Sequence, residues 1–317
     1  MALTDQIPTQ SGFHGKSTGD EVLEGLDLRG KVAVITGGYS GIGLETTRSL
    51  VAKGARVIVP ARAVERAKET LGSLAEVAPM DLADLGSVRA FAASLELPKL
   101  DYLLLNAGVM ACPETRVGPG WESQLAVNHF GHFALTAALM DLVRASEGIR
   151  VICLSSAAHK LSGMRWDDLH FTTGYDKWKA YGQSKTANAL FANGLSRRLR
   201  DSGGLAFSLH PGAIFTPLQR HLPLEEQQAM GWVGEDGQPT ERAKSLWKTP
   251  EQGCSTTLWA ATSPKLEGKP GVYCEDCDVA APTSPSSPRF TGVDAHACDD
   301  DDAERLWELT EAALASA

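Results

Sequence analysis

The chain has 317 residues, and its 30 lysines and arginines against 39 aspartates and glutamates give a formal net charge of −9. Hydrophobic residues make up 43% and charged residues 22%, a globular composition that excludes a largely disordered chain. The acidic balance argues against nucleic acid as a partner, because a protein that binds the phosphate backbone needs a basic surface.

The first residues, MALTDQIPTQ, have neither the basic nor the apolar region of a signal peptide. No stretch approaches the roughly 18 apolar residues of a membrane span, so we expect no membrane span. Six cysteines in a chain of this length do not indicate a disulfide scaffold. We therefore expect a cytoplasmic protein in a reducing compartment.

Residues 1–28 are polar and glycine-rich, and Thr18 with Glu21 has the pattern of a capping box. We expect an N-terminal arm here, with one short helix, that is either packed on the body or mobile. From Lys31 onward, short apolar strands bounded by turns alternate with helical patterns, which is typical of βαβ units around a parallel sheet buried on both faces. Strands are expected at 32–36, 56–60, 76–80, 102–105, 150–154, 206–209 and 271–274. Helices are expected at 42–52, 63–74, 88–94, 121–145, 181–201 and 251–262.

This alternation predicts an α/β fold, a single-domain Rossmann-type doubly wound parallel sheet flanked by helices, over residues 29–280. A C-terminal loop and helix would follow at 281–317, with the acidic run Asp299–Asp302 at the positive end of the helix. The segments 157–180 and 213–250 are too long for plain connections and carry several aromatic residues. We expect them to be substrate loops or lids.

A glycine-rich turn, Thr36–Gly43 (TGGYSGIG), follows the first strand and opens a helix. Dinucleotide phosphates require such a turn, because the backbone must come close and present free N–H groups at a helix N-terminus. The spacing differs from the commoner G-x-G-x-x-G, and by itself it is also compatible with a plain strand-to-helix turn.

The end of the second strand bears on which dinucleotide is bound. Proteins that bind NAD place an acidic residue about 20 positions after the glycines, on the ribose 2′-hydroxyl. Here Ala61 stands at that place and Arg62 follows. A guanidinium suits a 2′-phosphate by charge and by its forked geometry. Although an arginine at a strand end is common on protein surfaces, the pair favours NADP(H).

Tyr181 and Lys185 lie four residues apart in a helical pattern and therefore share one helix face. A free tyrosine has a pKa near 10, so a proton transfer close to pH 7 requires a shift of about three units. A neighbouring ammonium would lower that pKa. Two surface residues four apart are the alternative, and the pattern gains weight only from its context.

That context resembles the short-chain dehydrogenase/reductase family over about residues 28–280. The motifs occur in order: the glycine-rich turn, Asn106-Ala107-Gly108, Asn128, Ser156, Tyr181 with Lys185, and Pro211-Gly212. The segments RVICLSSAAHK, LAVNHFGHFALT and SLHPGAIFT resemble the branch that holds retinol dehydrogenases, WW-domain oxidoreductases and protochlorophyllide reductases.

The resemblance implies four catalytic residues. Tyr181 would be the general acid/base, Lys185 would lower its pKa and bind the nicotinamide ribose, Ser156 would orient the substrate oxygen, and Asn128 would shape the active-site helix. The choice of Ser156 over the adjacent Ser155 rests on the family pattern. The residues implied for the cofactor are Gly37, Tyr39, Ser40, Gly41, Ile42, Arg62, Asp81, Leu82, Asn106, Ala107, Gly108, Tyr181, Lys185, Pro211, Gly212 and Thr216.

The resemblance also implies a homodimer or homotetramer that pairs through helices 121–145 and 181–201, although some relatives are monomers. The 25 residues between Ser156 and Tyr181 (181 − 156) are more than in many family members. In some relatives an insert here hinders subunit pairing.

Several other residues have side chains that can bind a metal or a substrate. Cys274, Cys277, His296 and Cys298 have the residue types of a zinc site, but the spacing is a loose match, and we expect no metal. His159 and Lys160 follow Ser156 closely enough to touch a substrate, whereas His129 and His132 are expected to pack.

The sequence therefore predicts an NADP(H)-dependent oxidoreductase that interconverts a carbonyl and an alcohol of a small molecule. Reduction of a C=C bond is one alternative. A second alternative is an NADP(H)-binding sensor or scaffold without turnover, which would have no need of the acid/base residues.

Overall fold

The centre of the molecule is an eight-stranded sheet, and the computed structural model describes residues 3–317. Its strands are β1 (Val32–Ile35), β2 (Arg56–Ala61), β3 (Glu76–Pro79), β4 (Tyr102–Leu105), β7 (Arg150–Leu154), β8 (Leu205–His210), β9 (Tyr273–Glu275) and β10 (Asp278–Val279). The order across the sheet is β10-β9-β8-β7-β4-β1-β2-β3. All neighbours pair in parallel except β10, which runs antiparallel to β9. The doubly wound sheet predicted from the sequence is confirmed.

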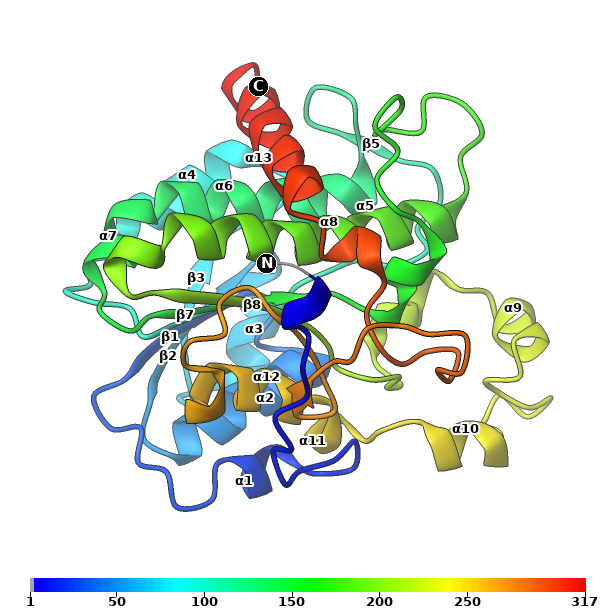
Figure 1. Ribbon diagram of the computed structural model, residues 1–317, viewed down its shortest axis with the longest axis horizontal. Coiled ribbons are helices and arrows are strands. Elements are labelled where there is room, and N and C mark those ends of the chain that lie inside the picture. The colour runs from blue at the N-terminus through cyan, green and yellow to red at the C-terminus, as the bar shows by residue number, and fades with distance from the viewer. Residues whose placement is uncertain (1–2) are drawn as a thin grey trace.

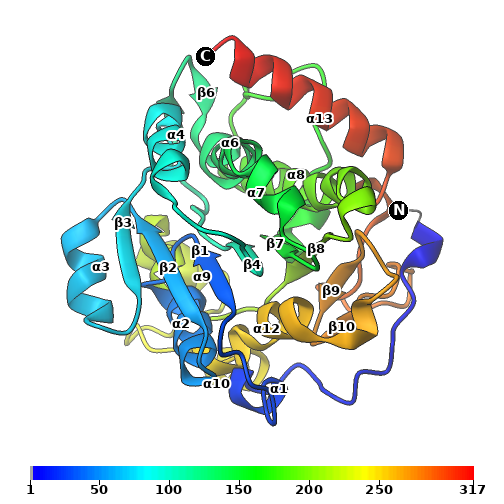
Figure 2. The same cartoon turned by 90° about the vertical axis from the view of Figure 1, so that its left-hand side faces the viewer.

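Helices cover both faces of the sheet (Figures 1 and 2). One layer holds α2 (Gly41–Ala52), α3 (Val64–Leu71) and α12 (Ser255–Thr262), and the other holds α4 (Leu85–Ser94), α6 (Gly131–Ala138) and α8 (Lys177–Arg198). Alternate strand residues serve the two layers, since Ala33 and Ile35 belong to the first apolar core and Val34 to the second. Both faces of a strand are thereby buried, which explains its continuous apolar sequence.

Shorter or peripheral helices complete the chain. They are α1 (Gly19–Val22), α5 (Ser123–Leu125), α7 (Met140–Ala145), α9 (Leu224–Ala229), α10 (Glu241–Leu246), α11 (Pro250–Gly253) and α13 (Asp300–Ala315). Figure 1 shows α9 and α10 at one side of the molecule, away from the two layers of helices. No helix within residues 3–317 is both long and apolar enough to cross a membrane.

The prediction of a single helix over 121–145 is wrong in three respects, the first of which is that α6 ends at Ala138 and α7 begins at Met140. Trp121–Glu122 is strand β6, which pairs with β5 (Arg116–Val117) in a small separate sheet. The Glu122 carboxylate then accepts hydrogen bonds from the backbone N–H groups of the next turn and so begins the helix at Ser123. A π-helical turn, Ala126–Phe130, interrupts the helix around Asn128.

Helix α8 begins at Lys177, four residues before the predicted start at Tyr181. Asp176 is its N-cap, and the carboxylate accepts hydrogen bonds from the N–H groups of Trp178 and Lys179. Trp178 therefore belongs to the same helix as Tyr181 and lies one turn before it.

The N-terminal arm packs on the body, where it follows the edge of the sheet at β10. The Asp278 carboxylate accepts hydrogen bonds from the Thr9 N–H and hydroxyl at 2.6 Å and from the Ser11 N–H at 3.0 Å. The capping box of Thr18 and Glu21 is confirmed at the start of α1. The boundaries of the arm and of the C-terminal region, at residues 28 and 281, stay predictions.

Helix α13 crosses α8 and packs against it (Figure 2). The Trp307 ring lies 4.6 Å from Phe133 of α6 and 5.8 Å from Phe191 of α8, measured between ring centroids, and the Arg198 guanidinium lies over it. The helix therefore covers part of the surface through which we expected two subunits to pair. A homodimer or homotetramer stays a prediction.

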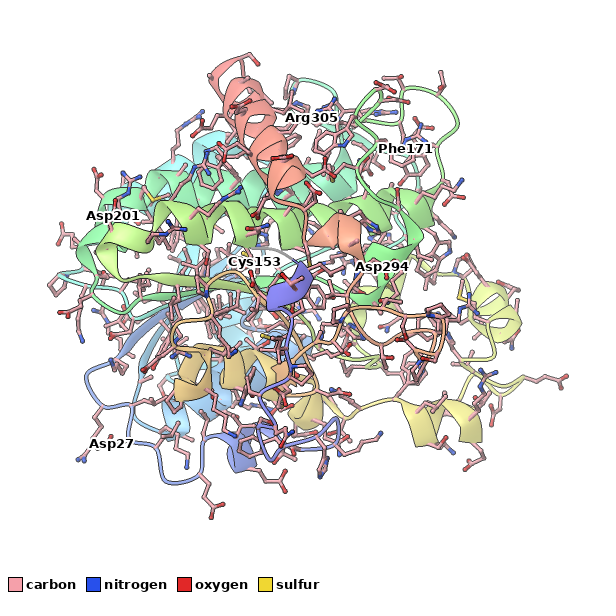
Figure 3. The ribbon with its side chains drawn as sticks, viewed as in Figure 1. Asp27, Cys153, Phe171, Asp201, Asp294 and Arg305 are labelled. Carbon is pink, nitrogen blue, oxygen red and sulfur yellow. The ribbon has the colours of Figure 1, made fainter. Side chains whose placement is uncertain are left out.

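All six cysteines are unpaired and buried. Cys153 lies in β7 beneath α8, at the centre of the molecule (Figure 3), and burial raises the pKa of its thiol well above the usual value. Such thiols are unreactive because the thiolate is the nucleophile.

Candidate active site

A cavity of about 1720 Å³ lies at the carboxyl ends of the parallel strands, the position at which doubly wound sheets bind their ligands. The glycine-rich turn, the residues at the end of β2 and the start of α8 all border it. Of the residues that the sequence predicted for catalysis and for the cofactor, all except Asn128 line this cavity.

The glycine-rich turn has the shape that a dinucleotide phosphate requires. Gly37 and Gly41 have φ angles of 67° and 54°, in the left-handed region that favours glycine. A Cβ on Gly43 would lie 2.5 Å from the Gly37 carbonyl oxygen. The Ser40 side chain makes no capping hydrogen bond, so it leaves the first N–H groups of α2 free for an anion. These residues fit a nicotinamide dinucleotide.

Thr36 connects this turn to the next strand. Its hydroxyl accepts hydrogen bonds from the Asn106 and Ala107 N–H groups, at 2.9 and 3.0 Å, and lies 2.9 Å from His132 Nε2. With both lone pairs used, the hydroxyl donates its proton to Nε2. His132 Nδ1 then carries the proton and donates it to the backbone oxygen of Asn128 at 2.9 Å. The predicted packing role of His132 includes this bridge.

Asn128 lies behind the cavity wall and is fully buried. Its side-chain oxygen accepts from the Val109 N–H at 2.8 Å, and its side-chain nitrogen donates to the Val109 oxygen and to the Ser184 hydroxyl, both at 2.9 Å. Asn128 therefore joins the loop after β4 to α8, so its place is structural support for the site.

Tyr181 and Lys185 share one face of α8, and the Lys185 Nζ lies 5.6 Å from the centre of the Tyr181 ring. Burial raises the pKa of Tyr181 to about 12, although the Ser156 hydroxyl opposes that rise. Loss of hydration therefore governs the pKa of Tyr181, and the expected lowering of this pKa by the Lys185 ammonium stays a prediction.

Lys185 is itself buried, and burial lowers its pKa to about 8. Its Nζ donates a 2.9 Å hydrogen bond to the Leu154 oxygen at the end of β7. A Cβ on Gly108 would lie 3.6 Å from this Nζ. The ammonium thus lies between two strand ends, where it faces the cavity.

The structure separates the two adjacent serines. The Ser155 hydroxyl donates a 2.7 Å hydrogen bond to the Lys185 backbone oxygen and is buried. The Ser156 side chain caps the turn that follows, where it accepts from the Ala158 N–H at 3.1 Å. Both serines line the cavity, but the Ser155 hydroxyl is bonded to α8, whereas the Ser156 hydroxyl interacts with Tyr181.

At the far end of the cavity lie Arg62 and a second arginine that the sequence analysis missed, Arg66 of α3. Both are exposed, and no ion pair within residues 3–317 involves either. Arg66 follows Arg62 by four residues, about one helical turn, and this spacing could have indicated that the two side chains lie close together. Asp81 and Leu82 line the same end.

An aromatic wall extends from Tyr181 toward the opening. Trp178 lies 6.3 Å from Trp232, which lies 5.0 Å from Trp247, which stacks on Phe215 at 4.0 Å, all between ring centroids. Three of these rings come from segment 213–250, so the predicted substrate loop does border the site. The Glu226 carboxylate accepts a 3.1 Å hydrogen bond from Trp178 Nε1 and also pairs with Lys177. This carboxylate secures α9 to the start of α8.

Two distant segments also line the cavity, and neither has a local sequence signal. His14, Gly15 and Lys16 come from the N-terminal arm, where Lys16 Nζ donates a 2.6 Å hydrogen bond to the Trp247 oxygen. Residues 289–291 come from the proline- and serine-rich loop.

Lys160 lines the cavity and pairs with Asp294 at 2.9 Å; Figure 3 labels Asp294. His159 is fully buried, and its Nδ1 lies 2.7 Å from the Ser156 oxygen. It therefore supports the serine turn from behind. Phe171 of the other loop, labelled in Figure 3, packs under the Arg165 guanidinium and is not part of the cavity lining.

Residues 3–317 contain no group of three or more His, Cys, Asp or Glu side chains arranged to hold a metal ion. Cys277 lies in the hairpin between β9 and β10, where its Sγ lies 3.2 Å from the Ser255 hydroxyl. His296 Nε2 lies 3.0 Å from the His159 oxygen.

Comparison with known proteins agrees with this geometry. Residues 31–227 match the short chain dehydrogenase family. The chain belongs to that family. It is an oxidoreductase of the family, and the resemblance to the retinol dehydrogenase branch is confirmed by its relatives.

A "Probable oxidoreductase" of Streptomyces antibioticus is 41% identical over 92% of this chain and 100% of that protein. "Retinol dehydrogenase 14" of Mus musculus is 36% identical over 90% of this chain and 86% of that protein. Among solved structures, a putative uncharacterized protein from Mycobacterium paratuberculosis has a TM-score of 0.69 at 31% identity, over 92% of this chain and 95% of that one. The "RhlG/NADP active-site complex" of Pseudomonas aeruginosa has a TM-score of 0.58 at 26% identity, over 75% of this chain and 91% of that one.

Proposed function

We propose that this oxidoreductase interconverts a carbonyl and an alcohol by hydride transfer, with NADP(H) as its cofactor. One observation carries the proposal: Tyr181, Ser156 and Lys185 meet in the cavity that the glycine-rich turn opens into. A binding module has no use for this set.

Each residue has a distinct role in this reaction. A bound nicotinamide cofactor would supply the hydride. Tyr181 donates its proton to the substrate oxygen, and Ser156 stabilises the charge that develops there. The Lys185 ammonium favours the phenolate that remains, which offsets part of the effect of burial. Asn128 and His132 hold the loop after β4 in place.

Two arginines support NADP(H) over NAD(H). Arg62 and Arg66 line the far end of the cavity without ion-pair partners, and Ala61 stands where an acid would bind the 2′-hydroxyl. A 2′-phosphate would provide the missing anionic partner. The likeness to the Pseudomonas aeruginosa protein, whose complex contains NADP, agrees with this assignment.

The alternatives predict different products or none. A C=C reductase would yield a saturated ketone in place of an alcohol, and a sensor would bind NADPH without consuming it. The cytoplasmic location also stays a prediction; a relative from Brassica napus, 37% identical, is named "chloroplastic".

The test is NADPH and NADH consumption by the purified protein across aldehydes, ketones and enones, with products identified by mass spectrometry. We expect alcohol products and faster turnover with NADPH. Saturated ketones would favour the C=C reductase, and tight NADPH binding without turnover on any compound would favour the sensor.

A further inference from the structure

The cavity has room for a large second ligand beside the cofactor. Pockets for single small molecules usually measure about 300–1,000 Å³, whereas this one measures about 1720 Å³. The end near Tyr181 is bounded by the aromatic wall of Trp178, Trp232 and Trp247. The substrate that fits this wall has an apolar body.

Exposed apolar side chains gather at the same cavity. Within residues 3–317, eight large apolar side chains are exposed, and half of them line this cavity. They are Leu161, Met230, Leu246 and Phe290. They come from four separate elements, so no single amphipathic helix accounts for them. Concentrated apolar exposure marks a ligand-binding surface, which indicates that the apolar body extends to the opening.

The lining of the cavity also contains five arginines without ion-pair partners. Among the ion pairs of residues 3–317, carboxylates pair with arginines on the outer surface, such as Arg48, Arg56 and Arg198. None of the five arginines that line the cavity takes part in an ion pair with a carboxylate. They are Arg62, Arg66, Arg220, Arg242 and Arg289. This excess of positive charge, in a chain of net charge −9, calls for anionic ligands.

The cofactor phosphates do not account for all five. Arg62 and Arg66 lie at the proposed 2′-phosphate end, whereas Arg220 lies toward the reaction end. It sits in a short 3₁₀ helix, Pro217–His221, between Leu218 and Leu222. Leu222 is buried in the same apolar cluster as Tyr181, and Leu218 packs against that cluster.

No carboxylate within residues 3–317 forms an ion pair with Arg220. Its Nη1 donates a 3.1 Å hydrogen bond to the Pro217 oxygen within its own turn. Its charge reaches the buried Cys112 thiol across the cluster, where it opposes the rise of that pKa. The side chain is exposed and lines the cavity, and a guanidinium has five N–H donors, so donors beyond the one used by Pro217 remain for a carboxylate.

We propose that the substrate is an amphipathic anion, a carbonyl compound with an extended apolar body and a carboxylate that Arg220 binds. The inference rests on the proposed carbonyl reduction, because it names the substrate class of that same site. Arg242 and Arg289 also line the cavity and add to the positive potential that attracts such a molecule.

The test compares 12-oxododecanoate with its uncharged methyl ester as substrates, with NADPH as cofactor. The enzymes are the wild type, Arg220→Met, and Arg144→Met as a control, since Arg144 of α7 is an exposed arginine outside the cavity. We expect the wild type to favour the acid by about tenfold or more in kcat/KM, as a charged hydrogen bond provides. Arg220→Met should lose this preference through a higher KM for the acid, and Arg144→Met should keep it.

A binding experiment makes the result independent of turnover. Tryptophan fluorescence would follow the binding of dodecanoate and of methyl dodecanoate, because three tryptophans line the cavity. We expect dodecanoate to bind more tightly than the ester, and Arg220→Met to remove the difference while NADPH binding is unchanged.

The outcomes separate the two proposals. Equal kcat/KM for acid and ester, or a preference that persists in Arg220→Met, overturns the carboxylate site but leaves carbonyl reduction intact. If Arg220→Met binds NADPH more weakly, Arg220 belongs to the cofactor site, and the proposed carboxylate site is also overturned. Selective dodecanoate binding without reduction of either aldehyde would retain the carboxylate site and refute the reaction.

Discussion

The ammonium of Lys185 lies 5.6 Å from the centre of the Tyr181 ring and is held there by a 2.9 Å hydrogen bond to the Leu154 oxygen. Burial acts on both groups in opposite directions, raising the pKa of Tyr181 to about 12 and lowering that of Lys185 to about 8. The phenol of Tyr181 therefore keeps its proton at neutral pH when no ligand is bound. Its phenolate must be stabilised by charges that arrive with the ligands.

Tyr181→Phe tests the proton donor. The substitution removes one oxygen and keeps the ring, so we expect NADPH binding within about twofold of wild type and a loss of turnover of about 10²–10⁴-fold, the usual worth of a general acid. NADPH fluorescence titration and initial rates measure the two quantities. Turnover near the wild-type rate would remove Tyr181 from the reaction.

The pH profile tests Lys185. Its amine carries a proton below pH 8 and loses it above, so we expect kcat/KM for NADPH to be constant at neutral pH and to fall as pH rises past about 8. Lys185→Met should be slower throughout and should lack this decline. A wild-type profile that stays flat to about pH 10 would contradict the assignment.

Arg62 and Arg66 test the cofactor preference. Replacing Arg62 with Asp supplies the acid that a 2′-hydroxyl prefers and repels a 2′-phosphate. We expect the ratio of kcat/KM for NADPH over NADH to fall by about 10- to 100-fold, and Arg66→Ala to lower it less, since each removes a charged hydrogen bond. Arg200→Asp, an exposed arginine outside the cavity, is the control. Unchanged ratios would exclude both residues from the phosphate site.

Glu226 tests the contact between α9 and the start of α8. Glu226→Ala removes the acceptor for Trp178 Nε1 and the partner of Lys177. Because partly exposed ion pairs contribute only about 0–1 kcal/mol, we expect a modest rise in KM for the carbonyl substrate, about two- to fivefold, with unchanged NADPH binding. Glu225→Ala, the exposed neighbour on α9, should behave as wild type. An effect of equal size in both variants would argue against the contact.

Buried histidines predict sensitivity to acid. Burial lowers the pKa of His129 to about 3 and those of His132 and His159 to about 4, below the ordinary 6.5. Below pH 6.5 the unfolded chain therefore binds more protons than the folded one. The contribution of these histidines to the free energy of unfolding is fully present above that pH and decreases as pH falls toward 4. Each histidine contributes up to about 1.4 kcal/mol per pH unit.

Urea unfolding at pH 7.5, 6 and 5 measures this dependence. His129→Gln should flatten the slope, since it removes one of the groups that take up a proton on unfolding. A free energy of unfolding that is the same at pH 7.5 and pH 5 would show that these side chains do not remain neutral in the folded protein.

The sequence by itself determined most of the sheet, because its main strands are short apolar runs bounded by turn residues, and these signals are local. It also determined the glycine-rich turn, where positive φ at Gly37 and Gly41 requires glycine, and the shared helix face of Tyr181 and Lys185, which follows from helical periodicity. The start of α8 at Lys177 could also have been predicted from the sequence, since Asp176 is a residue type that favours the N-cap position.

Tertiary structure alone decided the rest. Trp121–Glu122 is a strand because Arg116–Val117 lies beside it, and the helix after it changes to a π turn at the buried Asn128. The cavity receives Lys16 and Phe290 from opposite ends of the chain, and Tyr181 has a raised pKa because distant elements exclude water from it. Periodicity and turn chemistry depend on neighbours in sequence, whereas burial, desolvation and cavity shape depend on neighbours in space.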